Sequence, residues 1–194
     1  FAHSYVASPG KAKHLAVSGS NLIGLNYKSD ELESATTAVE GEIKIFTDAE
    51  LKNSTSFNVG TIAPNNGKNT IAVDNTGNIY VCKSAKGLMA YDTTGNPLWS
   101  KEYVTPVSSG NKNNQVDKRE GYINGVTVKG NYVYVAAGAY GVVILNKADG
   151  TEVAHRAVGN LNSANYITVD NNNNIYVAYG KGRIRVFKLR ATNN

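Results

Sequence analysis

One pattern occurs four times in the sequence: two β-rich runs joined by a short turn of Asn, Asp, Gly or Ser. The copies span residues 14–25, 70–81, 125–135 and 166–177. Turns of this composition tolerate positive φ, and β-branched or aromatic runs on both sides of such a turn are typical of a β-hairpin. Because internal repetition restricts a fold more than composition does, the sequence predicts an all-β repeat protein.

A third strand follows each hairpin and begins with a glycine. These strands span residues 41–46, 87–91, 141–145 and 182–187. The first and the fourth alternate charged and apolar residues, which predicts half-exposed strands. The third is continuously apolar, which predicts cover on both faces. A more polar fourth strand follows in three copies, at residues 54–59, 97–103 and 151–158.

The fourth copy ends at Leu189 without an outer strand, and the N-terminus offers a replacement. Residues 2–6 match residues 154–158, and each segment ends eight residues before the next hairpin. We therefore expect residues 1–7 to be the closing outer strand of the last sheet, since a free sheet edge invites pairing. The expected sheets span residues 12–60, 68–104, 123–159 and 164–190, in one domain over residues 1–194.

Four-stranded meanders repeated every 41 to 56 residues are typical of β-propeller blades. Residues 128–136 followed by 141–145 resemble the LVIVD repeat of bacterial surface propellers, and residues 73–81 resemble the hairpin of NHL and gluconolactonase-type propellers. The resemblance implies about four four-stranded antiparallel blades and a secreted or cell-surface bacterial protein. Two arrangements stay open: a closed four-bladed ring, or the C-terminal half of a larger propeller that exposes an apolar face to another chain.

Composition excludes several classes of function. Hydrophobic residues make up 41% of the 194 residues, enough for a core, and charged residues only 18%. The net charge of +5 is spread along the chain, a weak field for phosphate, so we expect no nucleic-acid partner. No apolar run approaches the ~18 residues of a membrane span. The single Cys excludes an intrachain disulfide and a cysteine zinc site.

The mouth of the predicted central channel is the first candidate ligand site. The positions at the start of the innermost strands are Lys13, His14, Asn69, Asn124 and Asn165. Asn side chains both donate and accept hydrogen bonds, which suits sugar hydroxyls, but they also cap turns and bond local backbone. Gluconolactonase-type propellers hold a divalent metal at such a mouth. No carboxylate occupies these positions, so we expect no metal and no cofactor.

The loops after the second strands are the second candidate. They carry Tyr27, Lys83, Lys86, Tyr140, Tyr179 and Lys181. Insertions at residues 28–40 and 105–123 are expected to project from the same face, where rigid strands position loops for binding. Aromatic rings and lysines suit an acidic glycan or an acidic protein surface, although solvated loop lysines are the plainer interpretation.

The sequence therefore favours a non-catalytic secreted or cell-surface binding module that recognises a glycan or protein, and it identifies no catalytic residue. One alternative is a propeller hydrolase or lyase acting on a sugar or lactone, with acidic residues on the insertions as donors: Asp30, Glu31, Glu33, Asp117 and Glu120. A second alternative is a fragment that completes a larger propeller with another chain.

Overall fold

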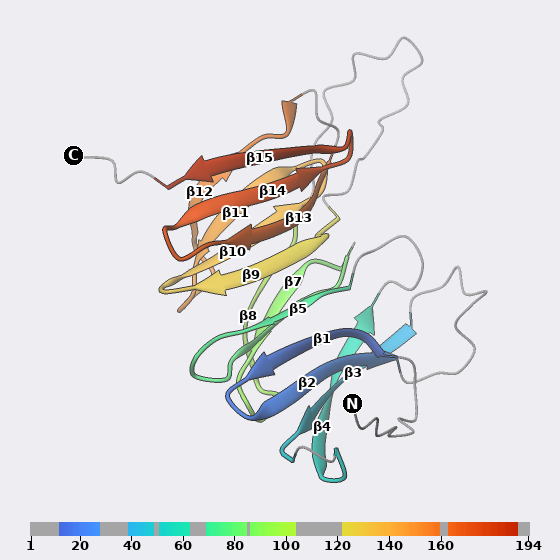
Figure 1. Ribbon diagram of the computed structural model, residues 1–194. Helices are drawn as coiled ribbons and strands as arrows, with labels where there is room; N and C mark the ends of the chain where they lie inside the picture. Colours follow the sequence, from blue (N-terminus) through green and yellow to red (C-terminus); the bar gives the residue numbers. More distant parts are fainter. Residues whose placement is uncertain are drawn as a thin grey trace, which may run out of the picture.

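The computed structural model describes residues 12–27, 39–48, 51–62, 69–84, 86–103, 122–159 and 163–189. These residues form four antiparallel sheets in chain order (Figure 1). Sheet 1 contains β1 (Ala12–Ser18), β2 (Asn21–Tyr27), β3 (Val39–Phe46) and β4 (Ser54–Ile62). Sheet 2 contains β5 (Ile71–Val73), β6 (Ile79–Cys82), β7 (Leu88–Tyr91) and β8 (Pro97–Lys101). Sheet 3 contains β9 (Gly125–Lys129), β10 (Tyr132–Ala137), β11 (Gly141–Asn146) and β12 (Glu152–Arg156). Sheet 4 contains β13 (Ala164–Val169), β14 (Asn174–Tyr179) and β15 (Arg183–Lys188).

Each sheet is a meander in which consecutive strands pair, so the predicted repeat of antiparallel strands is confirmed. Within the described part of the chain, sheet 4 has three strands, and β15 is its edge. The segment 1–7, expected to complete this sheet, lies outside the described residues. Most of both insertions lies outside them too.

Aspartate turns fix the hairpins of sheets 2 and 4. Asp74 Oδ1 accepts the backbone N–H groups of Thr76 and Asn78 at 2.9 Å each, and the Tyr80 hydroxyl donates to Oδ2 at 3.0 Å. Asp170 and Tyr176 repeat the arrangement in sheet 4. Burial alone would raise the pKa of Asp74, but the hydrogen bonds outweigh burial and lower it to about 2.

The core consists of three apolar clusters, each between two consecutive sheets. We call the side of a sheet that points to the preceding sheet its rear face, and the opposite side its forward face. Leu25 and Ile43 on the forward face of sheet 1 share a cluster with Ile71 and Val81 on the rear face of sheet 2. The same contact recurs between sheets 2 and 3 and between sheets 3 and 4.

Strand β11 is covered on both faces, as its sequence predicts. Val143 and Leu145 point to sheet 2, whereas Val142 and Ile144 point to sheet 4. All four are buried. An uninterrupted apolar run is therefore required here, because neither face meets water.

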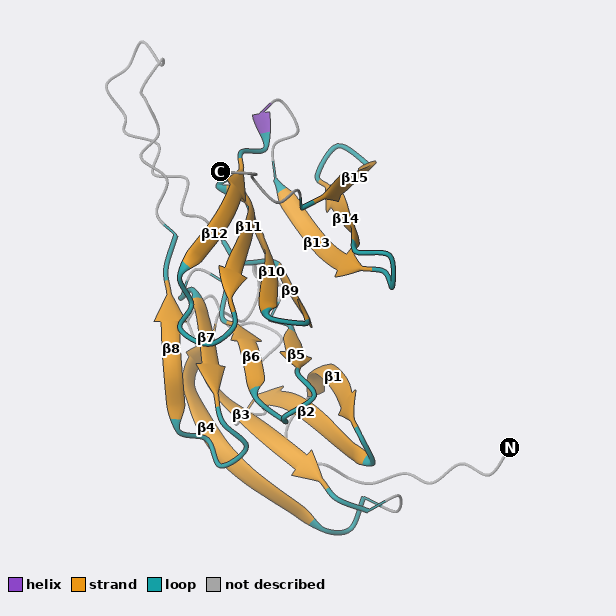
Figure 2. Cartoon of the chain, turned by 90° about the vertical axis from the view of Figure 1, so that its left-hand side faces the viewer, coloured by secondary structure: helices purple, strands orange, loops and turns teal. Residues whose placement is uncertain are grey.

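The sheets stand side by side as an open fan whose two ends do not pack on each other (Figure 2). On the rear face of sheet 1, Val17 is 72% exposed, and on the forward face of sheet 4, Ile184 is 73% exposed. A closed ring of four sheets would bury these faces against each other. Among the described residues the sheets therefore form an open arc.

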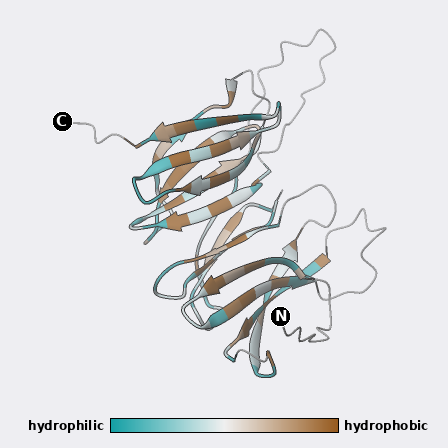
Figure 3. Cartoon of the chain, in the orientation of Figure 1, coloured by the Kyte–Doolittle hydropathy of each residue, from teal (hydrophilic) through white to brown (hydrophobic). Residues whose placement is uncertain are grey.

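The expectation of a half-exposed strand is wrong for β15. Its apolar residues Ile184 and Val186 are exposed together with Arg183 and Arg185. Among the described residues no sheet follows sheet 4, so its forward face is open, and the arginines lie on the rear face. In Figure 3, at the two ends of the fan, β1 carries a hydrophobic stretch, whereas β15 alternates hydrophobic and hydrophilic residues.

Candidate functional site

At the predicted channel mouth, Asn124 links sheet 3 to sheet 4. Its Nδ2 donates to the Ala164 carbonyl at 2.9 Å and lies 3.3 Å from Ser163 Oγ and 3.4 Å from Asn165 Oδ1. Asn124 and Asn165 are thus brought together. Their hydrogen bonds support a role in joining the sheets, in line with the turn-capping interpretation of these amides.

The remaining mouth residues gather between sheets 1 and 2. The Lys13 ammonium lies 4.9 Å from the centroid of the Tyr27 ring, and Asn69 Nδ2 donates to the Tyr27 hydroxyl at 3.5 Å. His14 Nδ1 accepts the Ile71 N–H at 3.3 Å, and burial lowers the pKa of His14, which favours the neutral acceptor. A cavity of about 240 Å³ lies beside the innermost strands, and residues of the first strand of each of the four sheets line it, from His14 in sheet 1 to Tyr166 in sheet 4. The mouth is therefore two clusters rather than one ring of free amides.

Two of the predicted loop residues have contacts inside the protein. Lys83 is buried, its Nζ donates to the Val59 carbonyl at 2.6 Å, and burial lowers its pKa. The Tyr140 ring stacks on His155 with centroids 4.2 Å apart. Lys86, in contrast, is exposed on its loop. These contacts support structural roles for Lys83 and Tyr140.

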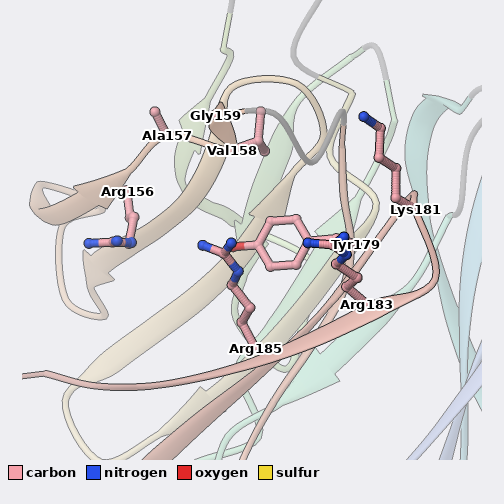
Figure 4. A pocket seen from close by; sticks show the side chains of 8 residues that line it. All are labelled: Arg156, Ala157, Val158, Gly159, Tyr179, Lys181, Arg183 and Arg185. Atoms are coloured by element: carbon pink, nitrogen blue, oxygen red, sulfur yellow. The ribbon is translucent and has the colours of Figure 1, made fainter.

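The other two loop residues, Tyr179 and Lys181, line a cleft of about 500 Å³ between sheets 3 and 4. Arg156 of β12 enters it from sheet 3, and Arg183 and Arg185 of β15 enter it from sheet 4 (Figure 4). We call this the arginine cleft. The Arg156 guanidinium lies 5.4 Å from the centroid of the Phe187 ring, a cation–π contact across the cleft.

Strand register aims the two β15 arginines at the cleft. Arg185 pairs with Val177, just as Met89 pairs with Val81 in sheet 2 and Val143 with Val135 in sheet 3. These positions lie on the rear face, so Arg185 points toward sheet 3. Arg183 lies two residues earlier on the same face, opposite Tyr179. An apolar position in two other sheets is thus an arginine in sheet 4.

The cleft has a strong positive charge. Among the described residues, no carboxylate lines the cleft, and none of its basic side chains forms an ion pair. The three arginines are exposed. Burial raises the pKa of Tyr179, and Arg185 and Arg156 act against that rise, so both charges reach the same hydroxyl. Several cationic side chains lining one cleft favour an anionic ligand, which Arg binds through two parallel hydrogen bonds.

The sequence predicts the residues at the edge of this cleft but not those at its centre. Tyr179 and Lys181 were expected on a binding face, whereas the three arginines were not singled out. The available signal was the repeat: the apolar residues Met89 and Val143 correspond to Arg185 in the fourth copy. A charged residue at a position that is apolar in other copies of a repeat indicates that the surroundings of this position differ.

Among the described residues, no group of three or more His, Cys, Asp or Glu side chains could hold a metal ion. The acidic insertion residues that the enzyme alternative requires lie outside that part of the chain. Nor does any helix in the described segments reach the length and apolarity needed to cross a membrane.

No family model and no curated protein matches this chain. Solved structures do match it. The computationally designed Ika4 protein is similar with a TM-score of 0.62 at 10% identity, over 96% of both chains. BamB from Moraxella catarrhalis is similar with a TM-score of 0.58 at 14% identity, and the Neurospora crassa Pan2 WD40 domain with 0.59 at 15%. These cover 93% and 92% of this chain but 45% and 47% of their own.

At these identities the likeness shows the fold alone. The chain is an all-β propeller structure of about four blades, which confirms the predicted fold class. It spans about half the length of BamB and of the Pan2 domain, and nearly all of Ika4. Membership of the LVIVD or NHL families stays a prediction.

Proposed function

We propose that this chain is a non-catalytic, secreted or cell-surface propeller module that binds an acidic glycan in the arginine cleft. The observation that carries the proposal is that Arg156, Arg183 and Arg185 line one concave site whose described lining contains no carboxylate. Three guanidinium groups repel one another in the free protein, and carboxylate or sulfate groups would relieve that repulsion.

The position of the cleft supports recognition by the loop-bearing face. Tyr179 and Arg183 flank the turn between the second and third strands of sheet 4. The connection from Tyr27 to Val39, which contains the first insertion, joins the same two strands in sheet 1. Connections of the same type emerge at the same end of a repeated meander, so the cleft opens on the face that the sequence predicts for binding.

The shape of the cleft favours a glycan over a flat protein surface. A volume of about 500 Å³ accepts a few sugar units, whereas a folded acidic surface would reach only its rim. The arginines are exposed, so their attraction is screened by salt within a distance of about 8 Å at physiological ionic strength. Binding should therefore weaken strongly as salt is added.

Titration calorimetry of the intact chain with a sulfated heparin hexasaccharide tests the proposal, with maltohexaose as the uncharged control. We expect binding at low salt to the sulfated probe alone. The Arg156→Ala/Arg185→Ala variant should weaken it by about tenfold or more, since each lost charge-assisted hydrogen bond contributes about 1.5–3 kcal/mol. Lys13→Ala/Lys86→Ala removes the same net charge outside the cleft and should leave binding within about twofold.

The other outcomes each decide against part of the proposal. Loss of binding in the lysine variant but not in the arginine variant would move the site to the channel mouth and loops. Tighter binding of a polyglutamate peptide than of the hexasaccharide would favour an acidic protein ligand. Absence of binding to both anionic probes would overturn the proposal.

A further inference from the structure

Three contacts between consecutive sheets are built in the same way, from a forward face and the next rear face. The two end faces of the fan are one such forward face and one such rear face. On the first strands of sheets 2, 3 and 4, the rear-face residues Ile71, Val126 and Ile167 are 3%, 8% and 1% exposed. The repeat alignment places Leu15 at the same position in sheet 1, where it is 54% exposed. On its first strand, sheet 1 thus has the apolar rear-face residue of its repeat, with Lys44 of β3 on the same face, and among the described residues no sheet lies in front of it.

The forward faces show the reverse situation. On the third strands of sheets 1, 2 and 3, Ile43, Leu88 and Val142 are 0%, 1% and 5% exposed. The position that pairs in the same way in sheet 4 is Ile184, which is 73% exposed. Tyr166, on the same face, is 53% exposed. The forward face of sheet 4 therefore exposes apolar residues that no described sheet covers.

We propose that a second copy of this chain covers both faces. The forward face of sheet 4 in each copy packs on the rear face of sheet 1 in the other. The two copies are related by a two-fold axis, and both contacts form together, so the association closes as a ring of eight sheets and leaves no end free. The proposal does not depend on the ligand of the arginine cleft.

A second copy is favoured as the occupant because it supplies a rear face of sheet 1 for one end and a forward face of sheet 4 for the other. A forward face and the next rear face are the surfaces that meet at every contact between consecutive sheets. The new contacts continue an interface that recurs between sheets 1 and 2, 2 and 3, and 3 and 4. Length agrees: the chain covers 46% of the designed Ika8 protein, with a TM-score of 0.58 at 10% identity, so two copies match one such chain. One copy cannot cover its own two end faces, since they lie at opposite ends of the fan (Figure 2).

The first test is the mass of the intact chain, measured by light scattering during size exclusion at micromolar concentrations. We expect about 41 kDa, twice the 20.7 kDa of one chain. Val17→Asp and Ile184→Asp should each give the monomer, because each charge lies in both contacts of the ring. Val153→Asp is the matched control: Val153 is 47% exposed but lies on β12, away from the end faces, so this variant should remain dimeric.

The second test asks which faces meet. Leu15→Cys and Ile184→Cys chains with different tags are co-expressed and treated with a short bismaleimide; the natural Cys82 is buried. We expect a cross-link between the two variants and none within either variant alone. Three results would each overturn the proposal. They are a cross-link of one variant to itself, an intramolecular link in a chain that carries both Leu15→Cys and Ile184→Cys, and a wild-type monomer of 20.7 kDa. The last result would assign the faces to sheets of another polypeptide.

Discussion

Sheets 3 and 4 are copies of one repeat, but their third strands have opposite environments. In β11, Val143 and Leu145 are fully buried on the rear face. In β15, Arg185 stands at the first of these positions, and both faces of the strand are largely exposed. Both third strands pair with their second strands in the same register, Val143 with Val135 and Arg185 with Val177, so strand pairing does not explain the difference. The neighbouring sheets explain it: among the described residues, sheet 3 lies between two sheets, whereas sheet 4 packs on one.

The largest expected effect on stability comes from truncating a buried side chain of β11. Leu145→Ala should lower the free energy of unfolding by about 3 kcal/mol, because it opens a cavity in a packed cluster. Ile184→Ala should change it by less than about 0.5 kcal/mol in dilute monomer, since its side chain is exposed. Urea unfolding followed by circular dichroism at submicromolar concentration measures both. Equal losses would contradict the open forward face.

The glycines that open these strands give a second, smaller contrast. Gly141 has a φ of +124°, and a Cβ there would meet the Arg156 carbonyl. Gly182 has a φ of +67° and open space around it. We expect Gly141→Ala to cost about 2–3 kcal/mol, from strain plus a backbone clash, and Gly182→Ala about 1 kcal/mol, from strain alone. Thermal unfolding of both variants tests the order, and a reversed order would place sheet 4 in a tighter environment than the structure shows.

Acid should distinguish the sheets through their aspartate turns. The pKa of both Asp74 and Asp170 is lowered to about 2, below the ordinary value of 3.8. A lowered folded-state pKa means that the stabilisation is present above pH 4 and is lost as the pH falls toward 2. Asp74 is also paired with Lys147 at 3.3 Å, which ties sheet 2 to sheet 3.

We therefore expect Asp74→Asn to flatten the fall in melting temperature between pH 5 and pH 2.5 more than Asp170→Asn does. Calorimetric scans at both pH values provide the measurement. An unchanged slope in Asp74→Asn would show that other carboxyl groups dominate acid unfolding.

The smallest effect concerns the outer edge between sheets 3 and 4. Trp99 lies opposite Ala90 in sheet 2, and the corresponding residue opposite Ile144 in sheet 3 is Ala154. An apolar cavity of about 180 Å³ lies beside Ala154 and Phe187. Ala154→Leu should fill part of it and add about 0.5–1 kcal/mol of stability in chemical unfolding. Destabilisation would mean that the space is already occupied.

Most of the fold could be predicted from the sequence because each sheet is encoded locally. The Asn, Asp and Gly turns define the hairpins, and the apolar run of β11 reveals a strand between two layers. The openness of the fan could not be predicted in this way. Leu15 and Ile71 are alike in sequence, and only the presence or absence of a preceding sheet makes one exposed and the other buried.

The candidate site was harder to predict. The mouth residues were found by their repeat position, but their hydrogen bonds depend on contacts between sheets, such as that of Asn124 with the Ala164 carbonyl. Lys83 reads as a loop lysine, yet its side chain reaches the Val59 carbonyl in another sheet. The arginine cleft combines β12 with β15, so no local pattern contains it. Comparison of the repeats shows that Arg185 replaces the apolar residues of sheets 2 and 3, but Lys44 stands at the same position in sheet 1.

Trp99 is the sole tryptophan of the chain, and its position limits what an optical experiment can detect. Its ring lies 5.7 Å from Tyr80, and its indole N–H donates to the Lys147 carbonyl of sheet 3 at 3.0 Å. Emission from this indole therefore monitors the seam between sheets 2 and 3. Detachment of sheet 4 would pass without a change in signal, so a fluorescence melt would describe the middle of the molecule while its last repeat had already come away.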